Sequence, residues 1–332
     1  MRTGKLEATL PTTDCVDHPA VAAWLAFSGK TAAPEHIDVL RSTIHRLAGA
    51  GPAGTSVIVQ YCRMQKALIE RTVYDEILPH VPVTAPRFYG LKRETSDFAW
   101  MFLEDVGDRR YSDADPVQRS LAGRWMGLLH SAASRLPAAR SLPEAGPQRH
   151  LNYLVTARND IRASLANPAS LEAADIDLLQ GIAGDLDAVE CDWADVERIC
   201  ASVPSTLVHG DFCPRNAYVR HGRDGLAIFP IDWENAGWGT PAVDLFRIDL
   251  PEYVSIVHTC WWPDVCLEAV QRLATVGKLL RCLAAIFWQT RLKATAARCL
   301  KGQIPALRVL RTRLTEAVLE LRRTTRLGVR EV

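Results

Sequence analysis

The chain has 332 residues and a hydrophobic content of 48%, which allows one large or two modest globular domains and excludes wholesale disorder. With 39 basic and 38 acidic residues the formal net charge is +1, so neither a nucleic-acid partner nor a membrane partner is expected. The nine cysteines are odd in number and form no Cys-x-x-Cys pair, so we expect neither a disulfide framework nor a zinc site. No signal-peptide pattern and no apolar run of about 18 residues is present, so we expect a cytoplasmic protein. For the assembly state we expect a monomer or a homodimer.

The first eighty residues mix helical and strand patterns. Residues 17–30 and 34–47 carry apolar residues at helical or mixed spacing, which predicts a helical N-terminal extension. A short β-branched run after a glycine-rich stretch predicts a strand over residues 55–61. The next segment, 64–78, places its apolar residues on one helical face, and prolines end it.

A boundary between two lobes is predicted shortly after residue 100. The apolar run FAWMFL at 98–103 indicates a buried strand, and the polar, turn-rich sequence EDVGD at 104–108 is typical of a hinge. We therefore predict an N-terminal lobe over residues 1–103 and a C-terminal lobe over residues 104–332.

Beyond the hinge the pattern is mainly helical. Helices are predicted over residues 115–130, 151–165, 171–189 and 265–327. Two short strand candidates stand between them at 205–208 and 226–231, and a hairpin of these two strands would hold the loop between them rigidly. Strands in the first lobe and helices in the second predict an α+β fold.

The loop between the two strand candidates carries polar residues that indicate chemistry. The sequence LVHGDFCPRN contains His209 and Asp211 and ends at Asn216, and FPIDWE follows with Asp232. A pairing of the strands would bring Asp211, Asn216 and Asp232 to one pocket. An Asp that orients a hydroxyl, together with an Asn and an Asp that offer oxygens to Mg²⁺, is the working set for phosphoryl transfer.

These motifs resemble a family signature. HGDFCPRN followed by IDWENAGWGTPAVDL is similar to the motifs of the aminoglycoside phosphotransferase and choline kinase superfamily, small-molecule kinases distantly related to protein kinases. Upstream, ERTVYDEILPHVPVTAPRFYG resembles the family's helix and strand entry, FAWMFLEDV its hinge strand, and LAGRWMGLLH its helix ending in Leu-His. The resemblance covers roughly residues 45–250. It implies a bilobal protein-kinase-like fold, with a small β-containing N-terminal lobe and a larger, mainly helical C-terminal lobe.

The resemblance implies roles for the residues of the HGDFCPRN loop. Asp211 would be the catalytic base, and Asn216 and Asp232 would hold Mg²⁺. His209 would brace the loop, and its place at the end of an apolar strand favours that role over the rival one of base. Asp244 would be structural and tie down the loop.

The resemblance also implies a nucleotide site in the N-terminal lobe. The hinge backbone at Glu104, Asp105 and Val106 would receive the adenine edge. Gly51 and Gly54 belong to the sequence GAGPAG, which spells G-x-G-x-x-G before a strand and would offer backbone N–H groups to phosphate oxygens. Runs of this composition are also commonly plain loops, so both interpretations stay open.

One element of the expected nucleotide site is missing. Kinases of this kind pair a strand lysine with a helix glutamate. If VIVQY is that strand, Gln60 stands at the lysine position and Glu70 is the helix partner. A glutamine cannot neutralise phosphate charge, so Lys66 and Arg63 are the alternatives from nearby, and the departure puts nucleotide binding in question more than the fold.

The sequence as a whole predicts a small-molecule kinase that transfers the γ-phosphate of ATP or GTP to a hydroxyl of an antibiotic, a sugar or a related metabolite. The last third of the chain is rich in Trp and only modestly acidic, so a ring-bearing or less cationic acceptor is open alongside a polycationic aminoglycoside. Two alternatives remain: a pseudokinase that binds nucleotide or ligand without turnover, which Gln60 favours, and an unrelated helical enzyme. The presence of Asp211, Asn216 and Asp232 together argues against the pseudokinase.

Overall fold

The computed structural model describes residues 9–10, 17–166, 171–222, 225–291 and 300–328. The chain divides into two compact units. The first, here called the sheet unit, consists of Met1–Leu121, Leu136–Leu142 and Asp211–Ala236. The second, the helical unit, consists of Ala122–Arg135, Pro143–Gly210 and Gly237–Val332. The lobe boundary after residue 103 stays a prediction.

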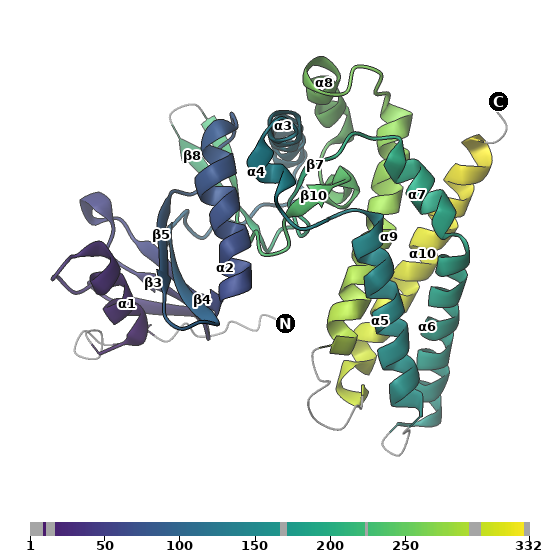
Figure 1. Cartoon of the computed structure of the whole chain (residues 1–332), viewed down its shortest axis with the longest axis horizontal. Coiled ribbons are helices and arrows are strands. Elements are labelled where there is room, and N and C mark those ends of the chain that lie inside the picture. The colour runs from purple at the N-terminus through teal and green to yellow at the C-terminus, as the bar shows by residue number, and fades with distance from the viewer. Residues whose placement is uncertain (1–8, 11–16, 167–170, 223–224, 292–299, 329–332) are drawn as a thin grey trace. The chain divides into compact units, whose positions relative to one another are not determined.

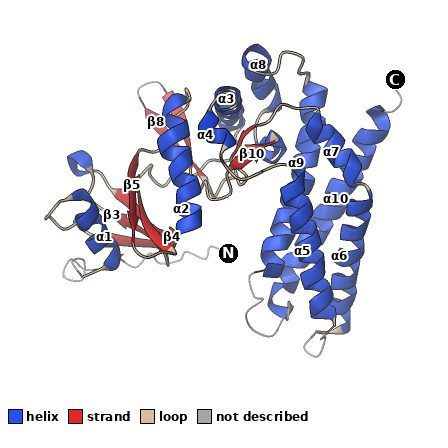
Figure 2. Cartoon of the chain, viewed as in Figure 1, coloured by secondary structure: helices blue, strands red, loops and turns tan. Residues whose placement is uncertain are grey.

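An antiparallel sheet forms the body of the sheet unit (Figure 2). In the described part of the chain it has six strands in the order β1-β2-β3-β4-β6-β5. These are β1 (Thr9–Leu10), β2 (Ile37–Arg41), β3 (Ile44–Leu47), β4 (Val57–Arg63), β5 (Phe88–Arg93) and β6 (Phe98–Glu104). The strands predicted at 55–61 and 98–103 are confirmed as β4 and β6.

The prediction of a helical N-terminal extension is correct for one segment and wrong for the other. Residues 17–30 contain helix α1 (Pro19–Ser28). Residues 34–47 form β2 and β3 instead. Ile37, Val39 and Ile44 are β-branched and favour extended backbone, and pairing with neighbouring strands decides between the two patterns.

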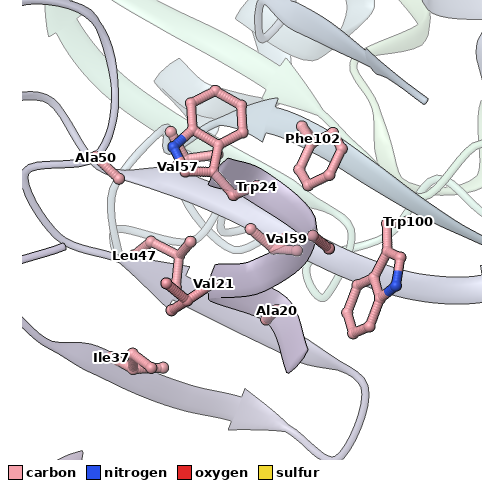
Figure 3. Packing of buried hydrophobic residues seen from close by; sticks show 11 residues of the cluster. Ala20, Val21, Trp24, Ile37, Leu47, Ala50, Val57, Val59, Trp100 and Phe102 are labelled. Atoms are coloured by element: carbon pink, nitrogen blue, oxygen red, sulfur yellow. The ribbon is translucent and has the colours of Figure 1, made fainter. Parts of the chain in front are cut away.

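Helix α1 covers one face of the sheet and buries an apolar cluster (Figure 3). The ring centroids of Trp24 in α1 and Phe102 in β6 lie 5.3 Å apart, and Val57 and Val59 of β4 are fully buried beside these rings. Because alternate residues of a strand point to opposite faces, Ile58, Gln60 and Cys62 point away from α1. The residues of the cluster are Ala20, Val21, Ala23, Trp24, Ile37, Leu47, Ala50, Val57, Val59, Trp100 and Phe102.

The other face of the sheet carries the segment predicted as a helix over 64–78 (Figure 1). It begins as helix α2 (Met64–Arg71), continues as a π-helical turn (Thr72–Ile77) and ends in a 3₁₀ turn (Leu78–His80). Pro79 has no backbone N–H to donate, which accounts for the end of the helical segment here. This segment brings Glu70 and Tyr74 to the same face of β4 as Cys62.

The predicted hairpin of strands 205–208 and 226–231 is wrong. The first strand, β7 (Thr206–Val208), pairs with β10 (Gly237–Gly239) in the helical unit. The second, β9 (Gly225–Pro230), pairs with β8 (Ala217–Gly222) in the sheet unit. The sequence AYVRHG of β8 is partly polar, so its alternation is weak, yet it is the nearest segment in the chain to β9.

The helical unit is built mainly from helices that pack side by side (Figure 1). Its long helices are α5 (Pro147–Leu165), α6 (Ala173–Cys191), α9 (Leu267–Arg291) and α10 (Ile304–Gly328). Shorter elements are α7 (Trp193–Ala201), the 3₁₀ helix η5 (Pro241–Arg247), α8 (Leu250–Cys260) and the 3₁₀ turn η6 (Lys301–Gln303). Helices α3 (Pro116–Ala133) and α4 (Pro137–Arg140) precede them in the chain.

The helices predicted over 115–130, 151–165 and 171–189 are confirmed, and so is a mainly helical C-terminal region, although residues 292–299 lie outside the described residues. No helix in the described ranges is long and apolar enough to cross a membrane.

Candidate active site

The HGDFCPRN loop begins in the helical unit, where the carboxylate of Asp244 holds it. Strand β7 ends at Val208, and the backbone N–H groups of His209 and Gly210 donate to the two carboxylate oxygens of Asp244 at 2.7 and 3.1 Å. Gly210 has a φ of 82°, a conformation that glycine adopts without steric cost. These hydrogen bonds agree with the expectation that Asp244 ties down the loop.

Asp244 is itself fixed by a buried histidine. The Nε2 atom of His130, at the end of α3, lies 3.5 Å from Asp244, and its Nδ1 atom lies 3.0 Å from the hydroxyl of Tyr253. Burial acts to raise the pKa of Asp244, but His130 and His209 outweigh it, and the pKa is lowered. Asp244 is therefore held as a carboxylate that orients the start of the loop. His209 is fully buried, which suits bracing better than base catalysis.

The loop continues in the sheet unit, where Asp211 and Asn216 are hydrogen-bonded to each other. The side-chain amide of Asn216 donates from Nδ2 to the Asp211 carboxylate at 2.9 Å and to the Asp211 carbonyl at 3.1 Å. The Asn216 carbonyl accepts from the N–H of Ile231, which links the loop to the segment that carries Asp232. With Nδ2 occupied, Oδ1 is the amide atom that remains to accept a hydrogen bond or to coordinate a cation.

Asp232 follows strand β9 and has a left-handed backbone with a φ of 67°. Non-glycine residues adopt this conformation at an energetic cost, and such strain gathers at functional sites. Burial, followed by the nearby carboxylates of Glu234 and Asp211, raises the pKa of Asp232 to about 6. Asp211, Asn216 and Asp232 are thus brought together as predicted, although by a different pairing of strands. Their catalytic and metal-binding roles stay predictions.

Glu70 adds a fully buried carboxyl group to this region. By hydrogen-bond geometry neither of its carboxyl oxygens has a partner within the described residues, although the backbone N–H of Trp233 acts to lower its pKa. Burial, and then the charges of Asp232 and Glu234, raise the pKa of Glu70 well above its usual range. A buried carboxylate without a partner is costly, so the neutral form of Glu70 is favoured.

A cation from α2 pairs with one of the neighbouring carboxylates. The ammonium group of Lys66 lies 2.6 Å from the carboxylate of Glu234. Gln60 is half-buried on β4, where it is paired in register with Ile44 and Met101. Arg63, the other alternative, has its guanidinium 5.6 Å from the centre of the Phe98 ring.

The glycine-rich loop lies at the opposite end of β4 from Cys62. Gly51 and Gly54 precede Val57, which is paired with Glu104, whereas Cys62 is paired with Ala99. At about 3.3 Å per residue, Val57 and Cys62 are roughly 16 Å apart along the strand. The structure therefore does not bring Gly51 and Gly54 together with Cys62 and the carboxylates beside it, and the phosphate-cradle role of this loop stays untested.

The turn between β2 and β3 lies at the Cys62 end of β4 and was not singled out from the sequence. The carbonyl of Thr43 in this turn accepts from the N–H of Tyr61, and Arg41 lies close enough to lower the pKa of Asp232. The turn contains no glycine, so no composition signal marked it. The pairing of Lys66 with Glu234 was likewise not predicted.

The predicted hinge residues stand at the end of β6. The Glu104 carboxylate accepts from Arg220 at 2.8 Å and from the N–H of Arg87 at 3.0 Å. The Asp105 carboxylate lies 2.8 Å from Arg46, and Val106 is buried. The side chains of Glu104 and Asp105 are thus engaged in ion pairs, which leaves the backbone as the part of this segment suited to meeting a nucleotide base.

The donor set fits Mg²⁺ better than a metal that needs many protein ligands. No group of three His, Cys, Asp or Glu side chains in metal-binding geometry exists among the described residues. Mg²⁺ takes one or two protein oxygens and completes its shell with water and phosphate oxygens. Asn216 and Asp232 offer two such oxygens near the candidate base.

An antiparallel sheet backed by α2, a loop that presents an Asp and an Asn, and a following Asp define a protein-kinase-like phosphotransferase. The sequence model of the phosphotransferase enzyme family matches residues 54–286, more than two thirds of the chain. The chain belongs to this family, and its enzyme class is a phosphotransferase with an alcohol group as acceptor. The alternatives of a pseudokinase and of an unrelated helical enzyme have no support in these comparisons.

Solved structures share the fold at low sequence identity. Plasmodium vivax ethanolamine kinase has a TM-score of 0.55 and 16% identity, over 85% of this chain and 80% of that chain. Wild-type aminoglycoside 2'-phosphotransferase-IIIa in its GDP complex has a TM-score of 0.58 and 12% identity, over 88% and 97%. An aminoglycoside phosphotransferase from Alicyclobacillus acidocaldarius has a TM-score of 0.51 and 12% identity, over 98% of both chains. These likenesses establish the protein-kinase-like fold that was predicted. No curated protein sequence matches the chain.

Proposed function

We propose that this enzyme transfers the γ-phosphate of ATP or GTP to a hydroxyl of an antibiotic, a sugar or a related metabolite, with Mg²⁺ as cofactor. The observation that carries the proposal is the gathering of Asp211, Asn216 and Asp232 in the sheet unit, with Asp211 and Asn216 hydrogen-bonded at 2.9 Å and Asp232 in a left-handed conformation. Nothing in the packing of a hydrophobic core calls for this arrangement of polar groups.

Each of the three residues has a role that its chemistry permits. Phosphoryl transfer proceeds through a loose transition state, so the protein mainly positions groups and stabilises charge. Asp211 accepts the proton of the acceptor hydroxyl, and the amide of Asn216 orients its carboxylate. Mg²⁺, held by Oδ1 of Asn216 and the carboxylate of Asp232, supplies positive charge to the phosphates when bound.

The acceptor stays open within the class of hydroxyl compounds. The last third of the chain is rich in Trp and only modestly acidic, which keeps a ring-bearing or less cationic acceptor in the proposal alongside a polycationic aminoglycoside.

The proposal also leaves open whether ATP or GTP is the phosphate donor. Among the similar structures, an aminoglycoside 2'-phosphotransferase was solved with GDP and a spectinomycin phosphotransferase with ADP. The hinge residues Glu104 to Val106 supply backbone groups in either case, so we keep both nucleotides in the proposal.

A direct screen tests the proposed function. The purified protein is incubated with ATP or GTP and Mg²⁺ against a panel of aminoglycosides, macrolides, amino alcohols and sugars, and mass spectrometry records products heavier by one phosphoryl group. A phosphorylated hydroxyl compound that depends on nucleotide and Mg²⁺ supports the proposal. Absence of both nucleotide binding and product formation across the panel contradicts it.

A further inference from the structure

The strand position that carries a lysine in related kinases holds an uncharged residue here. Gln60 points to the same face of β4 as Cys62, because the two residues are separated by one position in the strand. Cys62 lies beside acidic groups, since burial and then the charges of Glu70 and Glu234 raise the pKa of its thiol to about 12. Gln60 thus shares a sheet face with an acidic cluster, defined here as Glu70, Asp232 and Glu234, and brings no charge to it.

Lys66 supplies positive charge to this acidic cluster. Its ammonium lies 2.6 Å from Glu234, and its charge acts on both Glu70 and Asp232. Lys66 and Glu70 are four residues apart in α2, which places them on one face of the helix. Arg63 is less suited to this role because its guanidinium lies over the Phe98 ring.

Two further observations bear on whether Lys66 can bind a ligand. Glu70 is fully buried, and its carboxyl oxygens have no hydrogen-bond partner in the described part of the chain. The side chains of Lys66 and Glu234 are 37% and 24% exposed, so the ion pair is open to solvent and to a ligand. An ion pair of this exposure is held by only a modest free energy, and a more highly charged partner can replace it.

We propose that Lys66, from the first turn of α2, is the phosphate-binding cation of this enzyme in place of the strand lysine, and that Glu234 holds its ammonium when nucleotide is absent. The inference rests on the proposed nucleotide-dependent function and adds to it the group that neutralises phosphate charge. A lysine suits the exchange because its ammonium is a compact charge on a flexible four-carbon chain. Its movement from Glu234 to a phosphate leaves the fold of α2 unchanged.

Binding measurements test the inference without any need for turnover. Isothermal titration calorimetry with Mg²⁺ gives the Kd of the triphosphate, the diphosphate and the bare nucleoside for wild type and for Lys66→Met. We expect Lys66→Met to weaken triphosphate binding on the order of 10- to 100-fold, the range of a charge-assisted hydrogen bond. The affinity for the nucleoside stays within about twofold, because the nucleoside carries no phosphate.

Matched variants separate this role from a general effect of charge. Lys92→Met removes another lysine of the sheet unit, one that lies 3.3 Å from Glu94 and is 33% exposed, and it should leave all three affinities unchanged. The double variant Lys66→Met with Gln60→Lys restores a lysine on the strand and should recover most of the triphosphate affinity. Arg41→Met examines the rival cation near Asp232.

Specific outcomes overturn the inference. It is wrong if Lys66→Met binds triphosphate as tightly as wild type, if it weakens nucleoside and triphosphate equally, or if Arg41→Met alone causes the loss. Failure of the proposed function is recognised separately, because wild-type protein then binds no nucleotide at all, and the inference falls with it. If wild type binds nucleotide and Lys66→Met binds it with the same Kd, only the inference about Lys66 is wrong, and the proposed function stands.

Discussion

Two features of Asp232 cost free energy: its left-handed backbone conformation and the ionised form of its carboxyl group. A left-handed conformation costs a residue other than glycine on the order of 1 kcal/mol, and Asp232 adopts it with a φ of 67°. Burial and the neighbouring Glu234 and Asp211 further disfavour its ionised form. A divalent cation would offset the cost of ionising Asp232, which is why this carboxylate is suited to be a metal ligand.

Replacement of Asp232 should therefore remove metal-dependent turnover and preserve the fold. Asp232→Asn keeps a side chain that tolerates the left-handed region and removes one charge from the acidic cluster, so we expect an unchanged or slightly higher Tm. Turnover at saturating nucleotide should fall on the order of 100-fold or more, measured as initial rate against Mg²⁺ concentration. Asp75→Asn, at an exposed position of the same unit, is the control. An unaltered Mg²⁺ dependence in Asp232→Asn would reject the metal assignment.

Asp211 is expected to act in the chemical step and not in nucleotide binding. Asp211→Asn retains an oxygen that can accept from Asn216 but is no longer a base, so phosphorylation should fall on the order of 100-fold or more. Single-turnover measurement with saturating nucleotide and a confirmed acceptor records the loss, and calorimetry records unchanged nucleotide affinity. A large loss of rate in His209→Ala without loss of stability would instead favour the rival base.

The residues of the HGDFCPRN loop could be found from the sequence, and the ion pair between Lys66 and Glu234 could not. Asp211 and Asn216 lie five residues apart, so their proximity follows from local backbone, and their hydrogen bond needs no knowledge of the rest of the fold. The Lys66–Glu234 pair joins a helix of the first third of the chain to a segment beyond residue 230. No periodicity or spacing in a single sequence encodes such a contact.

At the scale of elements, the placement of Asp244 depends on a close approach between two helices. Asp244 belongs to η5, which packs on α9. Gly277 in α9 has no side chain, and a methyl group there would overlap the backbone carbonyl of Ala242 in η5. Glycine costs stability within a helix, so its use at this position is explained by the contact that it permits.

Gly277→Ala should consequently destabilise the protein and impair catalysis together. Overpacking against backbone costs about 1 to 3 kcal/mol, and a shift of η5 alters the carboxylate that orients His209 and Gly210. Gly184→Ala in α6 is the matched control, because nothing lies within 4 Å of its added methyl group. We expect that control to be neutral or more stable by about 0.5 to 1 kcal/mol. Urea denaturation and initial rates measure both effects, and equal stability of the two variants would contradict the close-approach explanation.

Element type was more predictable than element pairing. Helices with long apolar periodicity, such as α5 and α6, and the apolar strands β4 and β6 were found from their own residues. The pairing of β7 with β10 and of β9 with β8 was missed because β10 has only three residues, two of them glycine, and β8 is partly polar, so neither gives a strong pattern. Residues 34–47 were misjudged because sheet pairing overrides local spacing.

At the scale of the whole molecule, stability should depend on pH through a buried neutral histidine. His150 lies near the start of α5 with its Nδ1 atom 2.9 Å from the carbonyl of Gly146. Burial, and to a smaller extent the charges of Arg149 and Arg281, lower the pKa of His150 to about 4, which the Gly146 carbonyl only partly opposes. In the unfolded chain the same imidazole has a pKa near 6.5.

The sign of this effect follows from the order of proton uptake. As the pH falls below about 6.5 the unfolded chain binds a proton at His150 and the folded protein does not, until the pH approaches 4. The stabilisation is therefore complete above pH 6.5 and is lost toward pH 4, by roughly 3 kcal/mol over the window and roughly 2 kcal/mol between pH 7 and pH 5. Urea denaturation of wild type and His150→Gln at both pH values isolates the contribution, because all other titrating groups are shared. The free energy of unfolding of His150→Gln should fall less than that of wild type, and parallel losses in the two proteins would show that the pKa of His150 is the same in the folded and the unfolded chain.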